Sequence, residues 1–276
     1  MSDTAPLVCA GASSAAAASP SASKSVVDWR GLVLPVALVL VWYAATALEL
    51  VNTKLIVPPA GVAAQGLKEL GNANFYLGIG LSLWRDLSGF TLGALAGIAV
   101  GALIGVSRLA DKVIGPTFHT ARQISLFAWL PLLSALVGTG ELSKIIFIGF
   151  SAFYPVVLGT LEGVRGVSRA RAEVARVHGF TPAQLFFKLI LPAASPQILA
   201  GLRLGLIYAW LATSGAEYLL VNDGQGIGNT VFKGRMAFNV ELILFGLLAI
   251  GLVGNAFNRI AAVAERRLLR WRAPAR

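Results

Sequence analysis

Apolar residues gather in six segments along the chain, and polar stretches separate them. Most of these segments approach the roughly 20 apolar residues that a helix needs to cross a bilayer core about 30 Å thick. Because helices satisfy their backbone polar groups internally, the pattern predicts an all-α, polytopic membrane protein with six transmembrane helices. The expected spans are Leu32–Leu50, Leu87–Ser107, Ser125–Gly138, Lys144–Leu161, Gln197–Leu220 and Glu241–Ala262.

Two prolines and a long excursion modify this picture. Pro131 is expected to bend the third span or to mark a re-entrant start, and Pro155 interrupts the fourth. Between the first two spans, Lys54–Arg85 carries Pro58-Pro59 and then a weakly amphipathic segment. We expect this stretch to lie outside the cytoplasm and to include a helix on the membrane surface.

The second span has a glycine at every fourth residue. Residues four apart share one face of a helix, so the glycines leave a smooth groove in which another helix backbone can approach closely in lipid. The pattern indicates tight packing against a neighbouring helix, either as ordinary small-residue packing or so that the two helices can slide. It does not identify a functional site. The glycines are Gly89, Gly93, Gly97, Gly101 and Gly105, and a short connection, Arg108–Arg122, is expected to follow.

The longest polar interruption, Glu162–Pro192, begins with a predicted helix. Four valines recur at helical spacing and predict one apolar face. Glu173 is spaced for ion pairs with Arg169 and Arg176, and Glu162 for a pair with Arg165. The valines are Val164, Val167, Val174 and Val177.

A second helix is predicted after a glycine. Gly179 is a helix stop, and Thr181-Pro182 supplies an N-cap and a first-turn proline for a helix that ends at Leu191-Pro192. Five cations lie in this interruption: Arg165, Arg169, Arg171, Arg176 and Lys188. Two short helices joined at a glycine form a projection suited to contacting another molecule.

At these residues the chain resembles a family. Glu173-Val174-Ala175, then Gly179, then Leu189-Ile190-Leu191-Pro192 is similar to the cytoplasmic "EAA" loop of membrane subunits of binding-protein-dependent ABC importers. Val174 and Leu189 depart from the usual alanine and isoleucine. The resemblance implies the MetI-like fold of type I importers and a coupling contact with an ATP-hydrolysing subunit through Glu173, Ala175, Arg176, Gly179, Phe180, Leu189, Leu191 and Pro192. The alternative for this loop is a basic helix pair lying on lipid.

Composition supports a membrane protein and limits the chemistry. The chain is 56% hydrophobic and 13% charged, with a mean hydropathy of +0.73. Its net charge of +10 would suggest nucleic acid in a soluble protein, but the cations are segregated by loop, so we expect no nucleic-acid partner. The single cysteine, Cys9, excludes an internal disulfide and a cysteine metal site.

The distribution of cations predicts the orientation. With six spans and a cytoplasmic N-terminus, sixteen Lys and Arg lie in inside segments, six lie in outside segments and Arg203 lies within a span, which accounts for all 23. This positive-inside bias places both termini and residues 162–192 in the cytoplasm. The family resemblance implies a multi-pass protein of the bacterial inner membrane.

The chain divides into a tail and a membrane domain. Residues 1–28 are rich in Ala and Ser and predict a disordered cytoplasmic tail, whereas 29–272 form the transmembrane permease domain with 162–192 as its cytoplasmic coupling loop. Val221–Asn239 contains a glycine-rich turn, which we interpret as an extracytoplasmic loop because it lacks the Gly-Lys-Ser/Thr ending of a phosphate loop. We expect no catalytic residue, metal or cofactor in this chain.

Candidates for a solute pathway come from the spans. Glu217 follows small and hydroxyl residues and is expected to face the bundle interior or a partner subunit. Ser214, Trp129 and Pro131 complete the pathway candidates. Arg203 is expected either to reach the headgroups or to serve packing or gating.

The resemblance implies partners: two ATP-binding subunits, a second copy of the permease and an extracytoplasmic substrate-binding protein, all around the lipid bilayer. Gly138, Gly140, Glu141, Lys144, Phe153 and Pro155 are similar to the nitrate, sulfonate and taurine branch of the family. This implies import of a small oxyanion or organic solute. The alternative is an ATP-independent channel or secondary transporter, which would need ionisable pairs and interrupted helices along a pathway.

Overall fold

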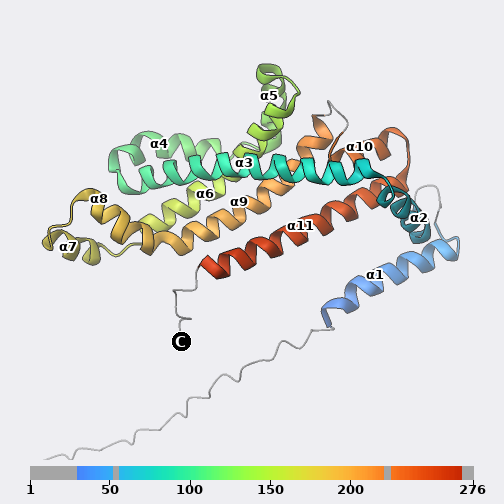
Figure 1. The fold of residues 1–276 in the computed structure, drawn as a ribbon, viewed down its shortest axis with the longest axis horizontal. Helices are drawn as coiled ribbons and strands as arrows, with labels where there is room; N and C mark the ends of the chain where they lie inside the picture. Colours follow the sequence, from blue (N-terminus) through green and yellow to red (C-terminus); the bar gives the residue numbers. More distant parts are fainter. Residues whose placement is uncertain (1–29, 52–55, 221–224, 269–276) are drawn as a thin grey trace, which may run out of the picture.

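A computed structural model describes residues 30–51, 56–220 and 225–268, and this part of the chain is helical throughout its regular structure. The predicted tail falls outside the described residues, as do 269–276. Four long helices lie lengthwise in a bundle (Figure 1): α3 (Ala73–Val106), α6 (Glu141–Arg165), α9 (Leu191–Leu219) and α11 (Val240–Leu268). The all-α, polytopic membrane architecture predicted from the sequence is confirmed.

The described part contains four helices long and apolar enough to span a membrane, and five spans if one bent pair counts as a span. The first of the six predicted spans corresponds to α1 (Arg30–Ala47), a shorter apolar helix that lies beside the bundle in Figure 1. Its apolar side chains, such as Leu34 at 68% exposure, are not covered by the rest of the chain. Trp42 Nε1 donates to Val57 O at 3.1 Å and ties α1 to the segment before α2 (Pro59–Leu70).

The glycine stripe of α3 packs against α6. A methyl group on Gly89 would lie 2.6 Å from Ile148 Cβ, and one on Gly101 would lie 2.7 Å from Val157 O. Gly93, Gly97 and Gly105 meet α6 in the same way. The predicted close approach of a second helix is therefore confirmed, and the partner is α6.

A core of small and aromatic side chains holds α6 and α9 together. Phe147, Ile148 and Ala152 of α6 are fully buried with Ala209 of α9. Relative to exposure to water, burying apolar surface stabilises this contact by about 25 cal/mol per Å². In lipid, the close fit of small residues takes over that role.

The third predicted span, Ser125–Gly138, is not one continuous helix. Residues 108–121 are a helix, α4 (Arg108–Ala121), where a short connection was expected, and the apolar segment after it holds a 3-10 turn (Leu126–Trp129) and the short α5 (Leu130–Val137). The two parts are bent by 96°. Pro131 lies in the first turn of α5, where its missing N–H costs nothing, so it marks the start of a broken span.

Two loop predictions also need correction. The expected surface segment Lys54–Arg85 divides into α2 and the first turns of α3, because Asn72 caps a helix that then runs unbroken into the span. The expected loop Val221–Asn239 contains α10 (Ile227–Met236). α2 and α10 have 12 and 10 residues, too few for a membrane span, so a search for long apolar segments does not find them.

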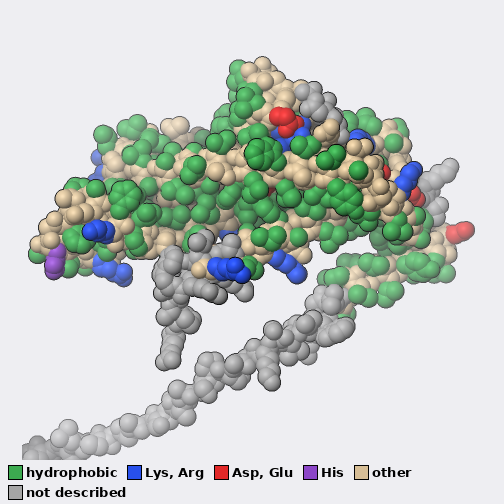
Figure 2. All heavy atoms as spheres, viewed as in Figure 1, with side chains coloured by type: hydrophobic (Ala, Val, Ile, Leu, Met, Phe, Trp, Pro, Cys, Tyr) green, Lys and Arg blue, Asp and Glu red, His purple; other side chains and the backbone are tan. Residues whose placement is uncertain are grey.

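Side chains on the bundle surface fit a membrane. Figure 2 shows hydrophobic side chains over the visible face of the long helices, while charged ones gather toward the ends and near α5. Exposed leucines on this surface include Leu92 at 60% and Leu95 at 64% on α3 and Leu252 at 70% on α11. A surface this apolar is covered by lipid or by other protein.

Candidate functional site

The predicted hinge is present at one end of the bundle. α7 (Arg169–Val177) and α8 (Pro182–Leu185) form a projection beyond the long helices (Figure 1). Gly179 between them has a φ of +77°, which favours glycine. Thr181 and Gln184 form a reciprocal capping box at the start of α8, so the N-cap prediction is confirmed.

The second helix of this projection does not end at Pro192. Phe186–Ile190 form a π-helical turn that continues directly into α9, so that Pro182–Leu219 is one helix of 38 residues. Pro192 lies in the first turn after the π turn, and Pro196 is also accommodated inside α9. The sequence interpretation was wrong because a wider turn absorbs a proline that would break a regular helix.

The first helix is shorter than predicted. Glu162 and Arg165 belong to the last turn of α6, where Arg165 pairs with Asp111 at 2.6 Å and Glu162 accepts from Gln197. The valines do not share a face, since Val164 is 8% exposed and Val177 is 86% exposed. The helix is interrupted between Arg165, where α6 ends, and Arg169, where α7 begins, so the valines of the two helices face different directions.

The proposed coupling residues lie on both sides of the hinge. Glu173, Arg176, Gly179, Phe180 and Pro192 are exposed, and Ala175, Leu189 and Leu191 are partly buried. An open hollow of about 620 Å³ lies between α7 and the π turn, lined among others by Ala175, Phe180 and Leu189. Ala175, Phe180 and Leu189 therefore border the same hollow.

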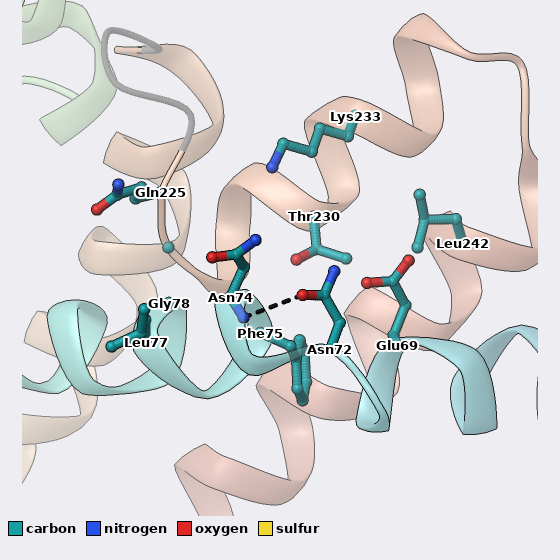
Figure 3. Close-up of a pocket in the computed structure, with 11 residues that line it drawn as sticks. Glu69, Asn72, Asn74, Phe75, Leu77, Gly78, Gln225, Thr230, Lys233 and Leu242 are labelled. Atoms are coloured by element: carbon teal, nitrogen blue, oxygen red, sulfur yellow. Dashed lines mark hydrogen bonds between the residues drawn. The ribbon is translucent and has the colours of Figure 1, made fainter.

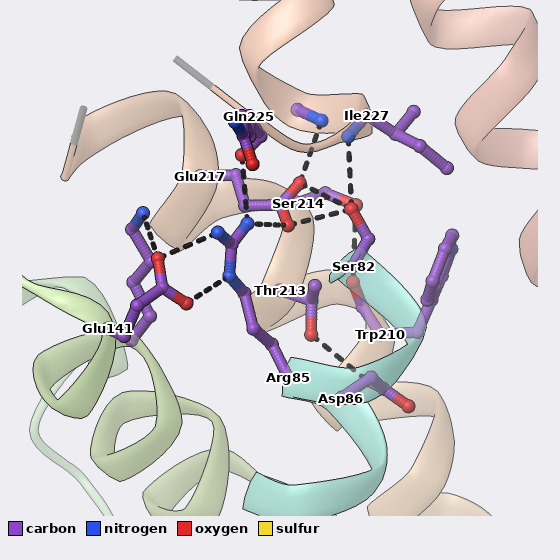
Figure 4. A network of polar contacts seen from close by, with 12 residues as sticks. Ser82, Arg85, Asp86, Glu141, Trp210, Thr213, Ser214, Glu217, Gln225 and Ile227 are labelled. Carbon is purple, nitrogen blue, oxygen red and sulfur yellow. Dashed lines mark hydrogen bonds and ion pairs between the residues drawn. The ribbon is translucent and has the colours of Figure 1, made fainter. Parts of the chain in front are cut away.

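Nearer the other end of the bundle, a buried charge network joins three helices and a loop (Figure 4). Arg85 of α3, 2% exposed, donates to Glu141 of α6 through Nε at 2.5 Å and Nη2 at 2.7 Å. Its Nη1 donates to Glu217 Oε1 of α9 at 2.8 Å and to Gln225 O at 2.9 Å. Lys144 pairs with Glu141 at 3.1 Å. The network thus fixes the relative positions of α3, α6 and α9.

Glu217 faces the bundle interior, as predicted. Both carboxylate oxygens are engaged: Oε1 by Arg85 and by the Ser82 hydroxyl at 2.7 Å, and Oε2 by the Gly228 N–H at 2.9 Å. Ser82 in turn accepts from Ile227 N at 3.0 Å. Since all these groups are buried, Glu217 has a clear structural role, and its pathway role stays a prediction.

Sequence reasoning missed Arg85 and its neighbour. Asp86 is fully buried and accepts from Thr213 Oγ1 at 3.0 Å, while its second oxygen has no partner in the described part. The overlooked signal is position: Ser82, Arg85 and Asp86 precede Gly89 on the same helical face as the glycine stripe.

The other pathway candidates are scattered. Trp129 stacks on Phe150 with ring planes 15° apart, Pro131 is exposed, and Ser214 donates to Trp210 O at 3.2 Å within its own helix. Ser214 lies three residues before Glu217 on α9 (Figure 4), whereas among the described residues neither Trp129 nor Pro131 makes a side-chain hydrogen bond to the Glu217 network. Among the described residues no cluster of three His, Cys, Asp or Glu could hold a metal.

A polar pocket of about 290 Å³ lies at the same end as the charge network (Figure 3). Asn72, Asn74, Thr230 and Lys233 line it, and Asn72 accepts from the Asn74 backbone N–H at 3.0 Å. Gln225 also lines it, so one wall is the segment held by Arg85. The pocket is hydrophilic and faces away from the α7 end.

Comparisons with known proteins agree on one family. Residues 89–270 match the binding-protein-dependent transport system inner membrane component. The chain is 32% identical to the putative aliphatic sulfonates transport permease protein SsuC of Bacillus subtilis (88% of this chain, 87% of that one). It is 34% identical to the nitrate import permease protein NrtB of Synechocystis (68% and 69%) and 30% to the taurine transport system permease protein TauC of Escherichia coli (85% and 86%).

A solved structure was also matched. The inward-facing MetNI methionine ABC transporter gives a TM-score of 0.49 at 21% identity, over 67% of this chain and 94% of that one. The assignment rests on the family match and the sequence relatives. The chain belongs to the family of inner-membrane permease components of binding-protein-dependent ABC transport systems.

Proposed function

We propose that this permease couples to an ATP-binding subunit through residues 162–192, with both termini and this loop in the cytoplasm. The family implies an ATP-binding subunit and a substrate-binding protein. Two copies of each membrane and ATP-binding subunit are our proposal. A twofold pair would give the two chains a shared axial cavity, since an isologous interface can close around its axis.

The observation that carries the coupling proposal is the exposed projection at the α7 end. Val177 of α7, at 86% exposure, and Phe187 of the π turn, at 65%, are large apolar side chains, and the cations Arg171 and Arg176 of α7 are exposed as well. Large apolar side chains exposed on this projection favour a contact with another protein, because their exposure to water is unfavourable. The coupling proposal assigns no chemistry to the projection.

The proposed solute is a small sulfonate, nitrate, taurine or a similar compound, by analogy with what the relatives' names state. The substrate-binding protein would deliver it at the end opposite α7. Closure of the ATP-binding subunits would displace the projection, and the axial cavity between the two permease copies would open alternately to the two sides of the membrane. Such coupling requires contacts that differ between the two states.

Co-purification with the ATP-binding subunit tests the coupling. Gly179→Val together with Glu173→Arg should abolish co-purification in detergent and the solute-stimulated ATP hydrolysis that depends on it. Lys112→Glu, an exposed change on α4, is the matched control and should retain both. Intact co-purification of the double variant, or solute uptake without ATP, would contradict the proposal and favour a channel or secondary transporter.

A further inference from the structure

An open hollow of about 400 Å³ lies between α6 and α9, away from the charge network. Ser151 and Tyr208 line it near the middle of their helices, and Ser151 Oγ donates to Tyr208 O at 2.7 Å. Glu162 and Gln197 line it toward the α7 end. Arg122, from the link after α4, also lines it, and Phe118, four residues earlier, packs on Tyr154 with ring centroids 5.9 Å apart. From Ser151 to Glu162 the hollow follows α6 for about 16 Å at 1.5 Å per residue.

The polar groups of this hollow are out of place on a lipid-facing surface. Tyr208 is 51% exposed in the middle of a spanning helix, and Tyr154 also lines the hollow. Neither phenol hydroxyl has a hydrogen-bond partner within the described ranges. In hydrocarbon each unpaired hydroxyl would carry a desolvation cost, whereas exposed leucines elsewhere on the bundle would carry none. The hollow therefore indicates a surface in contact with water or solute.

The cation that lines the hollow is available for a ligand. Arg122 is exposed, and no ion pair involves it within residues 30–51, 56–220 and 225–268. Glu162 already accepts from Gln197 Nε2 at 3.0 Å, so part of its carboxylate is engaged. A guanidinium binds planar or tetrahedral oxyanions through two parallel hydrogen bonds.

The rest of the wall is apolar. Leu158 lines the hollow between Tyr154 and Glu162 of α6, and Leu204 lines it between Gln197 and Tyr208 of α9. A wholly polar anion gains nothing from such side chains, but a short alkyl group attached to an oxyanion does. The lining thus combines one cation, two phenols and an aliphatic surface, and the carboxylate of Glu162 lies toward the α7 end.

We propose that this hollow is the chain's solute-contacting wall and that it takes a small organic anion with a short apolar group, with Arg122 contacting the anionic end. This rests on the proposed import function and identifies the class of solute. It also places the solute contact on Tyr154, Tyr208 and Arg122, at a different part of the bundle from Glu217.

Thiol labelling tests whether water reaches the hollow. In a Cys9→Ser background, which removes the single cysteine, Tyr208→Cys should react with a charged methanethiosulfonate reagent in the assembled transporter. Leu95→Cys is the matched control, because Leu95 is 64% exposed and lies between Gly93 and Gly97, which pack on α6 around Ala152 and Phe153. It should react at least about tenfold more slowly, since a thiol in hydrocarbon is shielded from an ionic reagent. Equal rates would overturn the proposal.

Reagent charge tests the role of Arg122. A sulfonate-bearing reagent should label Tyr208→Cys faster, relative to a trimethylammonium-bearing one, when Arg122 is present. Arg122→Gln should lower this ratio about fivefold or more, as expected for removal of one charge several ångströms away in a partly aqueous site. Arg122→Lys should largely restore it, and a ratio unchanged in Arg122→Gln would contradict the assignment.

Protection by ligands identifies the solute class. Ethanesulfonate should slow labelling of Tyr208→Cys more than nitrate does at equal concentration, and Arg122→Gln should remove the difference. Stronger protection by nitrate would contradict the proposed apolar contact. Because labelling needs neither ATP nor the binding protein, these results are separate from co-purification, which tests the coupling proposal.

Discussion

The two ends of the bundle are stabilised in opposite ways. At one end, Arg85, Glu141 and Glu217 come from three helices and are joined by ion pairs in which Arg85 and Glu217 are buried and Glu141 is 44% exposed. At the other, the α7–α8 projection is held by its own glycine and capping box, and its large side chains are exposed. The comparison indicates that the first end maintains the tertiary structure and the second is free to contact a partner. Substitutions should therefore separate stability from coupling.

The largest effect is expected at Arg85. Arg85→Met leaves the buried carboxylate of Glu217 without its cation, and breaking such a pair typically costs about 3–5 kcal/mol. Thermal unfolding of the purified protein in detergent should show a large fall in Tm. The double variant Arg85→Met, Glu217→Gln should recover part of it, because the uncompensated charge is gone. A Tm close to the unchanged protein's for the single variant would break the comparison.

A smaller effect is expected at the α3–α6 contact. Gly89→Ala places a methyl group 2.6 Å from Ile148 Cβ, and overpacking of this kind costs about 1–3 kcal/mol. Gly80→Ala on the same helix meets nothing within 4 Å and serves as the control. Its Tm should be unchanged or slightly raised, since alanine favours helix by up to about 1 kcal/mol over glycine. Similar Tm changes for both variants would contradict the packing.

At the hinge, function should change more than stability. Gly179→Ala forces a Cβ into a left-handed conformation at a cost of about 1–2 kcal/mol, but nothing lies within 4 Å of the new methyl. ATP hydrolysis in the assembled transporter should fall strongly, while the Tm of the isolated permease should fall by only a few degrees, as expected for a cost of this size. Gly251→Ala in α11, also with open space around it, should leave both unchanged. A large fall in Tm for Gly179→Ala would show that the projection is part of the stabilising core.

The smallest effect is expected for the ion pair between Arg203 and Glu265. Its atoms are 3.7 Å apart, and the Arg203 side chain is 48% exposed. Exposed pairs contribute about 0.2–1 kcal/mol, so a double-mutant cycle with Arg203→Gln and Glu265→Gln should give a coupling energy within that range. A value above about 2 kcal/mol would mean that this pair behaves like the buried network.

Local signals predicted well what local physics determines. Gly179 and Thr181-Pro182 announce a stop and a start within four residues, and the glycine repeat of the second span requires a close neighbour whatever the fold. The same reasoning failed where distant residues decide the outcome. Arg85 argues against a span when considered alone, and only its carboxylate partners on α6 and α9 allow its burial.

Helix continuity was also beyond a local interpretation. Pro192 has the position of a helix stop, yet a π turn over Phe186–Ile190 lets the backbone continue. Likewise α4 and α10 are polar enough to resemble connections. Their helical state depends on caps and on the segments they pack against, which a hydrophobicity pattern does not contain.

One uninterrupted helix from Pro182 to Leu219 has a thermodynamic consequence. Its first residue is in the projection, and Glu217 near its last residue holds the segment that forms a wall of the polar pocket lined by Asn72 and Lys233. At 1.5 Å per residue the rod is about 57 Å long. Linkage between two binding events is reciprocal, so if nucleotide state shifts the far pocket through this rod, occupancy of that pocket must shift nucleotide affinity by the same factor. Under that condition, solute binding at the pocket changes the nucleotide affinity of the ATP-binding subunit through this one helix.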